Sequence, residues 1–314
     1  MKDNIAVIGA GIVGLATARA LQKKFPQSKV TVFEKEDHLG AHQTSHNSGV
    51  IHSGIYYKPG SEKALNCRRG YELLIEFCNE NSIPYDLCGK IIAATENSEL
   101  EKLNSIYQRG IDNELTDLTI LDEAEIKKQE PHCAAIKGIH VPQAGIVDYK
   151  KVAEKLSQFI LQQGAQILLN HKVIGISNKS VETHHGKFNF DYLVTTPGLY
   201  SDRIAKLVDP ALDFKIIPFR GEYYELRPES QKLVNNLIYP VPDPKLPFLG
   251  VHFTRMISGG VECGPNAVFA FSREGYSWTK FNAYDTWDAL SWPGFHQIVL
   301  KYWKTGMGEV TRSL

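Results

Sequence analysis

Two histidines six residues apart, His46 and His52, lie in the run SHNSGVIHSGIYY, which otherwise contains mostly small, hydroxyl and aromatic residues. An imidazole can transfer a proton beside a cofactor, bind a metal ion, or pack in a core with backbone partners. A metal site needs three or four converging ligands, and no cysteine, histidine or carboxylate lies at a matching spacing nearby. We therefore predict no metal site, and proton transfer and packing stay open as alternatives.

A glycine turn near the amino terminus is the second candidate for chemistry. The stretch NIAVIGAGIVGLATARALQKKFPQSKVTVFEK reads as strand, turn, helix and strand, and the turn has the spacing G-x-G-x-x-G. Gly9 permits the sharp turn, Gly11 lets a pyrophosphate approach the backbone, and Gly14 lets the helix pack closely. Glu34 follows 20 residues after Gly14, where a carboxylate accepts hydrogen bonds from ribose hydroxyls. The pattern predicts dinucleotide binding and does not separate NAD from FAD.

The elements that must position these residues indicate an α/β chain. Apolar periodicity predicts helices over 61–81 and 148–164. A buried strand is predicted to end at Thr196, before a glycine-containing turn and another helix. From residue 214 onward the sequence is rich in β-strand and aromatic residues, which indicates a separate substrate platform.

The composition excludes several classes of function. The 314 residues include 35 basic and 35 acidic ones, so the chain lacks the sustained positive field that nucleic-acid binding requires. The five cysteines show no C-x-x-C spacing and predict reduced thiols in a cytoplasmic protein. No segment approaches the roughly 18 uninterrupted apolar residues of a membrane-spanning helix. Association with the inner membrane surface leaves no obligatory mark in a sequence and stays open.

Together these residues resemble the FAD-dependent D-amino-acid-oxidase-like superfamily. The resemblance runs through VIGAGIVGLATARAL, VFEKE, SHNSGVIHSGIYY, AGIVDYKKVAEKL and LVTTPGLYSDRIA. Within the superfamily, NSGVIHSGIYYKPGSEKA, CGKIIAA, PFRGEYYEL, GVHFTR and GPNAVFAFSREGY are most similar to L-2-hydroxyglutarate oxidases and dehydrogenases. The resemblance implies a discontinuous, Rossmann-like FAD-binding domain and an α+β, β-sheet-rich substrate domain. We assign residues 1–85 and 145–212 to the first domain, and 86–144 and 213–314 to the second.

The resemblance also implies FAD as the cofactor and assigns residues to it. The matching positions are Gly9, Gly11, Gly14, Glu34 and Lys35 for the ADP part, Thr44 and Ser45 for the pyrophosphate and flavin, Val173 for the adenine, and Gly198 for a turn close to FAD. His46 falls where some relatives carry a histidine joined covalently to the flavin, whereas many others hold FAD without a bond.

The implied activity is oxidation of L-2-hydroxyglutarate to 2-oxoglutarate, with hydride transfer to the flavin and return of the electrons to oxygen or a quinone. His52 is the candidate base for the hydroxyl proton. Guanidinium groups bind carboxylates bidentately, so Arg220 and Arg255 are candidate ligands for the two substrate carboxylates. A surface arginine or an interdomain ion pair explains each of them equally well. Candidate hydroxyl donors, if they do not serve packing, are Tyr56, Tyr57, Tyr223 and Tyr239.

Three alternatives to this function stay open. A relative that acts on amines or glycerol 3-phosphate would show the same features. Superfamily members continue for several dozen further residues, including a glycine-containing segment that lies against the isoalloxazine, whereas this sequence ends at GMGEVTRSL. We therefore expect the C-terminal part of the usual fold to be missing, and a flavin-poor, inactive remnant is the second alternative. An NAD-linked dehydrogenase is the third.

Overall fold

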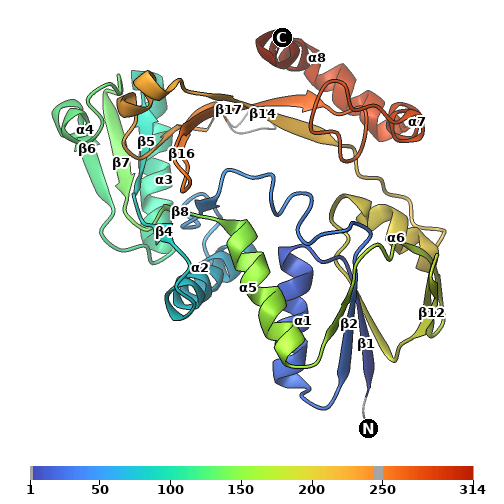
Figure 1. Cartoon of the computed structure of the whole chain (residues 1–314). Coiled ribbons are helices and arrows are strands. Elements are labelled where there is room, and N and C mark those ends of the chain that lie inside the picture. The colour runs from blue at the N-terminus through green and yellow to red at the C-terminus, as the bar shows by residue number, and fades with distance from the viewer. Residues whose placement is uncertain (1–2, 243–249, 314) are drawn as a thin grey trace. The chain divides into compact units, whose positions relative to one another are not determined.

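The computed structural model describes residues 3–242 and 250–313, which form two compact units. Among the described residues, unit 1 comprises 3–47, 149–220 and 269–308. Unit 2 comprises residues 48–148, 221–268 and 309–314. Each unit combines helices with at least one β-sheet (Figure 1).

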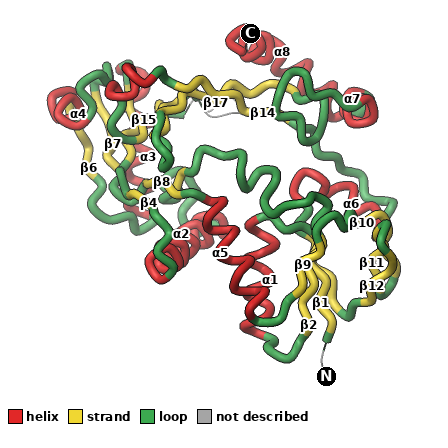
Figure 2. Tube along the Cα trace, viewed as in Figure 1, coloured by secondary structure: helices red, strands yellow, loops and turns green. Residues whose placement is uncertain are grey.

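Unit 1 contains a parallel sheet of four strands in the order β13-β1-β2-β9. These strands are β1 (Asn4–Ile8), β2 (Lys29–Phe33), β9 (Gln166–Leu168) and β13 (Tyr192–Thr195). Parallel neighbours need crossover connections, and α1 (Ile12–Lys24) provides the one between β1 and β2. The helix α5 (Tyr149–Gln162) packs beside α1 (Figure 2), and Nε2 of Gln22 joins them by donating to the carbonyl oxygen of Ile160. Because all four strands are parallel, their carboxyl ends lie at one edge of the sheet.

A second β-layer and α6 (Ser201–Val208) pack against this sheet. The layer is an antiparallel sheet of β10 (Val173–Ser177), β11 (Ser180–Thr183) and β12 (Gly186–Asn189). Alternation along β1 turns Ala6 and Ile8 towards it. The buried residues of the shared core are Ala6, Ile8, Phe33, Val173, Val181 and Ile204. Val173, the first residue of β10, therefore packs in the same core as Ile8, the last residue of β1.

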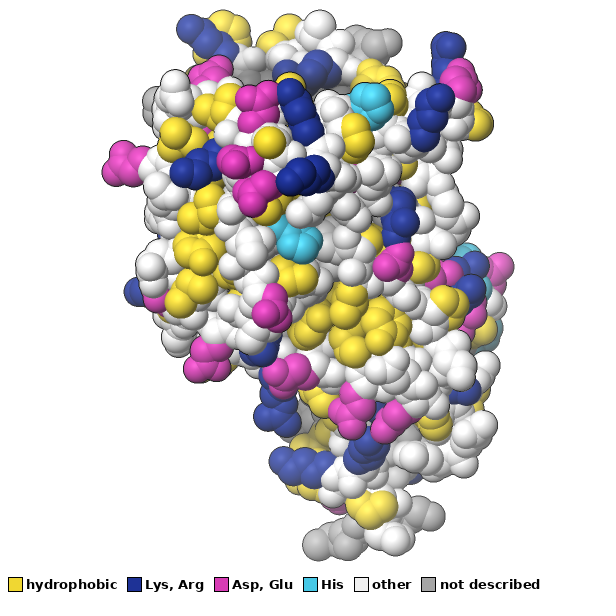
Figure 3. All heavy atoms as spheres, turned by 90° about the vertical axis from the view of Figure 1, so that its left-hand side faces the viewer, with side chains coloured by type: hydrophobic (Ala, Val, Ile, Leu, Met, Phe, Trp, Pro, Cys, Tyr) yellow, Lys and Arg dark blue, Asp and Glu magenta, His cyan; other side chains and the backbone are white. Residues whose placement is uncertain are grey.

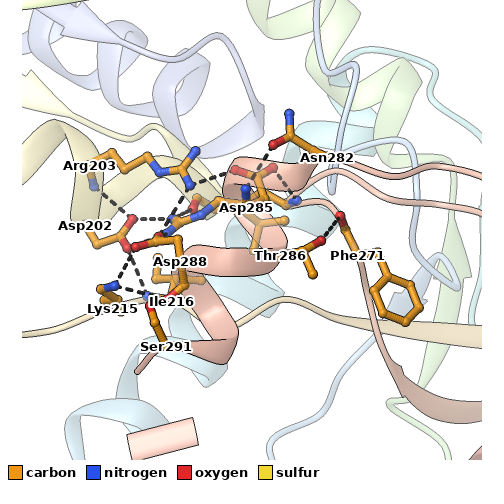
Figure 4. Close-up of polar contacts among 12 residues, drawn as sticks. Asp202, Arg203, Lys215, Ile216, Phe271, Asn282, Asp285, Thr286, Asp288 and Ser291 are labelled. Atoms are coloured by element: carbon orange, nitrogen blue, oxygen red, sulfur yellow. Dashed lines mark hydrogen bonds and ion pairs between the residues drawn. The ribbon is translucent and has the colours of Figure 1, made fainter. Parts of the chain in front are cut away.

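An ionic network joins α6 to α7 (Ala283–Leu290) within unit 1 (Figure 4). Its charged members are Asp202, Arg203, Lys215, Arg273, Asp285 and Asp288. Arg273 and Asp202 form the centre, since their side chains are only 2% and 3% exposed. Asp202 also accepts a hydrogen bond from the backbone amide of Ile216 at 3.0 Å. The helix α8 (Pro293–Ser313) follows α7.

Unit 2 contains a mixed sheet of seven strands in the order β14-β17-β16-β15-β5-β7-β6. The strands are β5 (Lys90–Ala94), β6 (Thr119–Asp122), β7 (Lys137–Val141), β14 (Phe219–Glu225), β15 (Leu237–Pro240), β16 (His252–Arg255) and β17 (Val261–Phe269). β15 pairs with β5 in parallel and with β16 antiparallel. The helix α3 (Leu100–Asp112) covers one face of β5 and β7, and α4 (Glu123–Gln129) covers the other.

Shorter elements complete unit 2. β3 (Val50–Ile51), β8 (Gly145–Val147) and β4 (Tyr85–Asp86) form a small antiparallel sheet. The helix predicted over 61–81 is confirmed as α2 (Glu62–Glu80), which begins after Ser61 because its Oγ accepts a hydrogen bond from the amide of Ala64. The remaining short helices are η1 (Asn97–Glu99) and η3 (Pro228–Leu233) in unit 2 and η2 (Gly198–Tyr200) in unit 1.

The compact units differ from the predicted domain bounds chiefly in two segments. Residues 48–85 lie in unit 2, where β3 and β4 pair with β8. Residues 269–308 lie in unit 1, where Arg273 and α7 bind α6. A compact unit is defined by packing, whereas the predicted domains are defined by their ligands. The assignment of FAD and substrate to particular ranges therefore stays a prediction, and residues 1–2, 243–249 and 314 of those ranges lie outside the described residues.

The surface shows no dominance of one charge on the face drawn in Figure 3, where acidic and basic side chains are interspersed. This agrees with equal numbers of acidic and basic residues in the sequence. Within the described residues, every helix is too short or too polar to cross a membrane.

Candidate cofactor cavity and ionisable cluster

A cavity of about 410 Å³ lies in unit 1 at the carboxyl ends of β1, β2 and β13. Seven residues predicted to bind FAD line it: Gly9, Gly11, Glu34, Lys35, Thr44, Val173 and Gly198. Open α/β sheets bind nucleotides at this edge, because the turns after the strands converge there. The fold therefore brings together most of the predicted cofactor residues from distant parts of the sequence.

The glycine turn between β1 and α1 forms one wall of this cavity. Gly9 has a φ of +102°, and a Cβ there would lie 2.5 Å from the carbonyl oxygen of Thr196. A Cβ at Gly14 would lie 1.9 Å from the Gly9 carbonyl oxygen, so Gly14 serves close packing of the helix. A Cβ at Gly11 would meet Thr44 Oγ1 at 3.3 Å and no other described atom within 4 Å. The missing side chain of Gly11 therefore leaves space in the cavity rather than in the core.

Two polar side chains of the cavity wall are fixed by backbone amides. Glu34 accepts hydrogen bonds from the amide of Ala10 at 2.8 Å and from the amide of Glu36 at 3.0 Å. Thr44 Oγ1 accepts one from the amide of Ile12, in the first turn of α1, at 3.0 Å. Both side chains are buried. Each oxygen keeps a further lone pair, so the carboxylate can also accept from ligand hydroxyls.

Lys35 lies in a charged cluster at the cavity wall. Its Nζ is 2.8 Å from Oε2 of Glu274 and 2.8 Å from Nε2 of His42, and it also donates to Glu36. Its hydrogen bond lowers the pKa of Glu36 to about 2. Burial opposes protonation of His42, but hydrogen bonds to Glu274 and Glu36 outweigh burial and raise the pKa of His42. Glu36, His42 and Glu274 lie close enough together to bind a metal ion, yet the Lys35 ammonium already forms ion pairs with both carboxylates.

Other residues of the cavity wall were missed from the sequence. Thr196 directly follows β13, and its Oγ1 donates to the carbonyl oxygen of Ile8 at 2.8 Å. Tyr200 and His171 also line the cavity. The signal for Thr196 was present, because a residue that ends a parallel strand beside β1 must reach the same edge as Glu34. His171 lies in a turn whose position depends on the second β-layer, and the sequence gives no comparable signal for it.

Gly14, Ser45 and His46 are outside the described lining of this cavity. The His46 ring stacks on Tyr276 with the ring centroids 3.8 Å apart, and its Nδ1 lies 2.9 Å from the carbonyl oxygen of His42. Ser45 and His46 are both exposed. Local contacts account for the position of His46, and its role in holding FAD stays a prediction.

The predicted base, His52, lies in unit 2 directly after β3, among other ionisable groups. Its side chain keeps solvent-exposed surface, whereas Lys90 and His252 are buried. Crowding by protein lowers the pKa of His52, and the charges of Lys90 and His252 lower it further. His52 is therefore neutral at pH 7, the form in which an imidazole accepts a proton.

The register of the strands places two tyrosine rings beside His252. Ile238 of β15 pairs with Phe253 of β16, so their neighbours Tyr239 and His252 are adjacent, with ring centroids 4.0 Å apart. Nδ1 of His252 lies 3.0 Å from the carbonyl oxygen of Gly250. The Tyr223 ring is 6.4 Å from that of His252. The structure thus places the predicted hydroxyl donor Tyr223 beside His252.

The two predicted carboxylate ligands occupy different units. Arg255 forms an ion pair with Asp86 and lines a second cavity, of about 310 Å³, in unit 2. Arg220 is buried in unit 1, where its NH1 donates to the carbonyl oxygens of Gly275 and Ser277. Arg220 is thus not a surface residue, and Arg255 is ion-paired within unit 2.

Comparison with known proteins identifies the family. The FAD dependent oxidoreductase family (DAO) matches residues 4–312, and the chain belongs to this family. An L-2-hydroxyglutarate dehydrogenase of Indibacter alkaliphilus is 51% identical over 318 residues, which cover 100% of this chain and 80% of that protein. The mitochondrial L-2-hydroxyglutarate dehydrogenase of Homo sapiens is 42% identical over 326 residues, covering 99% of this chain and 70% of that protein.

Solved structures agree with this assignment. An FAD-bound L-α-glycerophosphate oxidase of Mycoplasma pneumoniae superposes with a TM-score of 0.75 and 26% identity, covering 87% of this chain and 73% of that one. The predicted superfamily, the α/β fold class and the FAD-dependent oxidoreductase class are confirmed.

Proposed function

We propose that this protein oxidises L-2-hydroxyglutarate to 2-oxoglutarate with FAD as its cofactor. The observation that carries the proposal is the 51% identity to an L-2-hydroxyglutarate dehydrogenase over the whole chain. The glycine turn and the Glu34 carboxylate at the cavity of unit 1 support the cofactor.

The residues of this cavity fit the ADP part of FAD. Gly11 leaves space where a pyrophosphate approaches the first turn of α1. The Glu34 carboxylate, held by two backbone amides, is available to ribose hydroxyls. When bound, FAD accepts the hydride that leaves the carbinol carbon of a 2-hydroxy acid. The chain itself must bind the diacid, remove the hydroxyl proton and exclude water.

His52 receives the hydroxyl proton in this proposal. Its lowered pKa keeps it unprotonated at neutral pH, and its exposed surface gives substrate access. Tyr223 donates a hydrogen bond to the substrate. Arg255 binds a carboxylate of the substrate, which replaces the Asp86 carboxylate as the partner of its guanidinium group. Arg220 is assigned the same role, although backbone carbonyl groups occupy part of its guanidinium.

The test is an anaerobic titration of the full chain, supplied with FAD and freed of excess. L-2-hydroxyglutarate should bleach the flavin and yield one 2-oxoglutarate per flavin, whereas the D-enantiomer should not. Bleaching by glycerol 3-phosphate or an amine in its place would support a related activity. A chain that neither binds FAD nor reacts would support an inactive remnant, and nicotinamide reduction without flavin would support an NAD enzyme.

The electron acceptor, oxygen or a quinone, is part of the proposal. Mixing the substrate-reduced protein with dissolved oxygen or with a soluble quinone compares the two directly, and the faster reoxidation identifies the acceptor. A cytoplasmic location and contact with the inner membrane surface stay predictions.

A further inference from the structure

A buried lysine in unit 2 has no acidic partner among the described residues. Lys90 begins β5, and its side chain is only 1% exposed. Its Nζ lies 4.6 Å from the ring centroid of Tyr56 and 4.9 Å from that of Tyr239. No hydrogen bond or ion pair to the Lys90 side chain occurs in the described part of the chain. Aromatic faces attract an ammonium group, but they compensate only part of the hydration that burial removes.

The hydroxyl group of Tyr56 is a second buried donor without a hydrogen-bond partner in the described residues. Burial raises the pKa of Tyr56, so it stays protonated and can only donate to an anion. The ammonium and the phenol lie close together and both lack an acceptor. A carboxylate oxygen can accept from both donors, and its charge also neutralises the buried ammonium.

The surroundings of Lys90 connect this pair of donors to the predicted base. His52, His252 and Cys67 lie close enough to interact electrostatically with Lys90. Burial lowers the pKa of Lys90 to about 8, and Cys67 opposes the shift, so the ammonium form still dominates at pH 7. β5, which carries Lys90, pairs in parallel with β15, which carries Tyr239.

The two arginines proposed to bind substrate already have partners within the protein, unlike Lys90 among the residues that the structure describes. Arg255 pairs with Asp86, and Arg220 donates to backbone carbonyl groups. Lys63 provides a matched comparison, because its Nζ also lies 4.6 Å from a tyrosine ring, that of Tyr57. Lys63 is exposed, however, so water hydrates its charge. Burial, rather than the tyrosine contact, is what distinguishes Lys90.

We propose that Lys90, together with the hydroxyl group of Tyr56, binds one carboxylate of the dicarboxylate substrate. This rests on the proposed function for the identity of the substrate, but it assigns a binding residue that the sequence did not single out. The four-carbon stem of lysine lets the ammonium follow the carboxylate by small rotations. In the absence of ligand the two tyrosine rings hold the charge.

The test uses glutarate, which has both carboxylates but no hydroxyl group and so cannot be oxidised. Calorimetric titration of the FAD-supplied full chain at pH 7 should show that Lys90→Met weakens glutarate binding by roughly 30-fold or more. Lys63→Met should change the affinity by less than about twofold. Lys90→Met should unfold at the same or a higher temperature than the parent, because methionine removes a buried charge.

The pH dependence gives a second, independent measurement on the unaltered protein. Carboxylate binding needs the ammonium form, so glutarate affinity should stay level up to about pH 8 and then fall about tenfold per pH unit. Lys90→Arg should keep binding and lose this alkaline limb. NMR of Lys90 should show its pKa rising when glutarate is added.

The outcomes separate this inference from the proposed function. Unchanged glutarate affinity in Lys90→Met, a Lys90 pKa that ignores glutarate, or a parent that binds no glutarate would each overturn the role of Lys90. If Lys90-dependent glutarate binding occurs without oxidation of L-2-hydroxyglutarate, the carboxylate site stands and the proposed function fails. If oxidation occurs with the same KM in Lys90→Met, the function stands and the carboxylate site fails.

Discussion

At the residue scale, two glycines of the turn between β1 and α1 have different roles. We assign Gly11 to FAD binding, whereas Gly14 is required for packing of the helix. Gly11→Ala should change the free energy of unfolding by less than about 1 kcal/mol, because its Cβ would meet only the Thr44 hydroxyl, at 3.3 Å, among described atoms. The same methyl group should weaken FAD binding by about tenfold or more, because it fills space at the pyrophosphate. Gly14→Ala should lose about 1–3 kcal/mol of stability, since a Cβ there lies 1.9 Å from a carbonyl oxygen.

Urea unfolding and a fluorescence titration with FAD measure the two effects. The matched control is Gly70→Ala in α2, where a Cβ would meet no described atom within 4 Å. That variant should gain about 0.5–1 kcal/mol from helix propensity and keep its FAD affinity. Full FAD affinity in Gly11→Ala would contradict the assignment of this turn to the pyrophosphate.

The base is also tested at the residue scale. His52→Asn should slow anaerobic flavin reduction by about 10²- to 10⁴-fold while FAD stays bound. The pKa of His52 lies below the ordinary 6.5, so the reduction rate should be level near neutral pH and fall only as pH drops through the lowered pKa. His52→Asn should lose that acidic limb. His184→Asn, at an exposed position, is the control, and stopped-flow absorbance is the measurement.

At the scale of elements, the Asp202–Arg273 pair holds α6 to the segment before α7. Asp202→Ala leaves the Arg273 guanidinium buried without its main partner and should cost about 3–5 kcal/mol of unfolding free energy. Asp213→Ala, at an exposed position of the same unit, should change it by less than about 0.5 kcal/mol. A loss below 1 kcal/mol in Asp202→Ala would show that the pair does not hold these elements together.

The same pair sets an acid dependence of stability. Burial raises the pKa of Asp202, but hydrogen bonds from Arg273 and the Ile216 amide outweigh burial and lower it below the ordinary 3.8. A lowered carboxyl pKa contributes stability that is fully present above the ordinary value and is lost as pH falls through the folded value. The parent should therefore lose more stability than Asp202→Ala between pH 5 and pH 2. Denaturant unfolding at several pH values measures the difference.

Elements also explain which parts of the site the sequence could predict. Gly9, Gly11 and Glu34 lie within one strand–helix–strand stretch, so their spacing alone predicted that they line the same cavity. Lys90 and His252 lie on strands separated by more than a hundred residues, and only the pairing of β5 with β15 and of β15 with β16 brings them together. Spacing along the chain carries no signal for such contacts, which is why Lys90 was missed.

At the scale of the whole molecule, the two units interleave along the sequence. The fold class followed from the glycine turn and the β-rich region after residue 214, whereas the bounds of the compact units depend on packing between distant segments. Residues 269–308 read as a continuation of the β-rich region, whereas buried ion pairs attach them to α6. Buried ion pairs between distant segments leave no periodic pattern, so the sequence placed this segment with its neighbours in the chain.

Hydrogen exchange tests the division of ligands between the units. FAD should protect backbone amides of unit 1 most strongly, in the glycine turn at Gly11–Ile12 and after β13 at Thr196–Tyr200, because bound ligand suppresses local opening. Glutarate added to the FAD-loaded protein should add protection in unit 2, around His52–Tyr56 and at Lys90. The amides of α4 serve as the internal control, since neither ligand is expected to contact them. Added protection by glutarate confined to unit 1 would contradict the assignment of the substrate to unit 2, and with it the roles of His52 and Lys90.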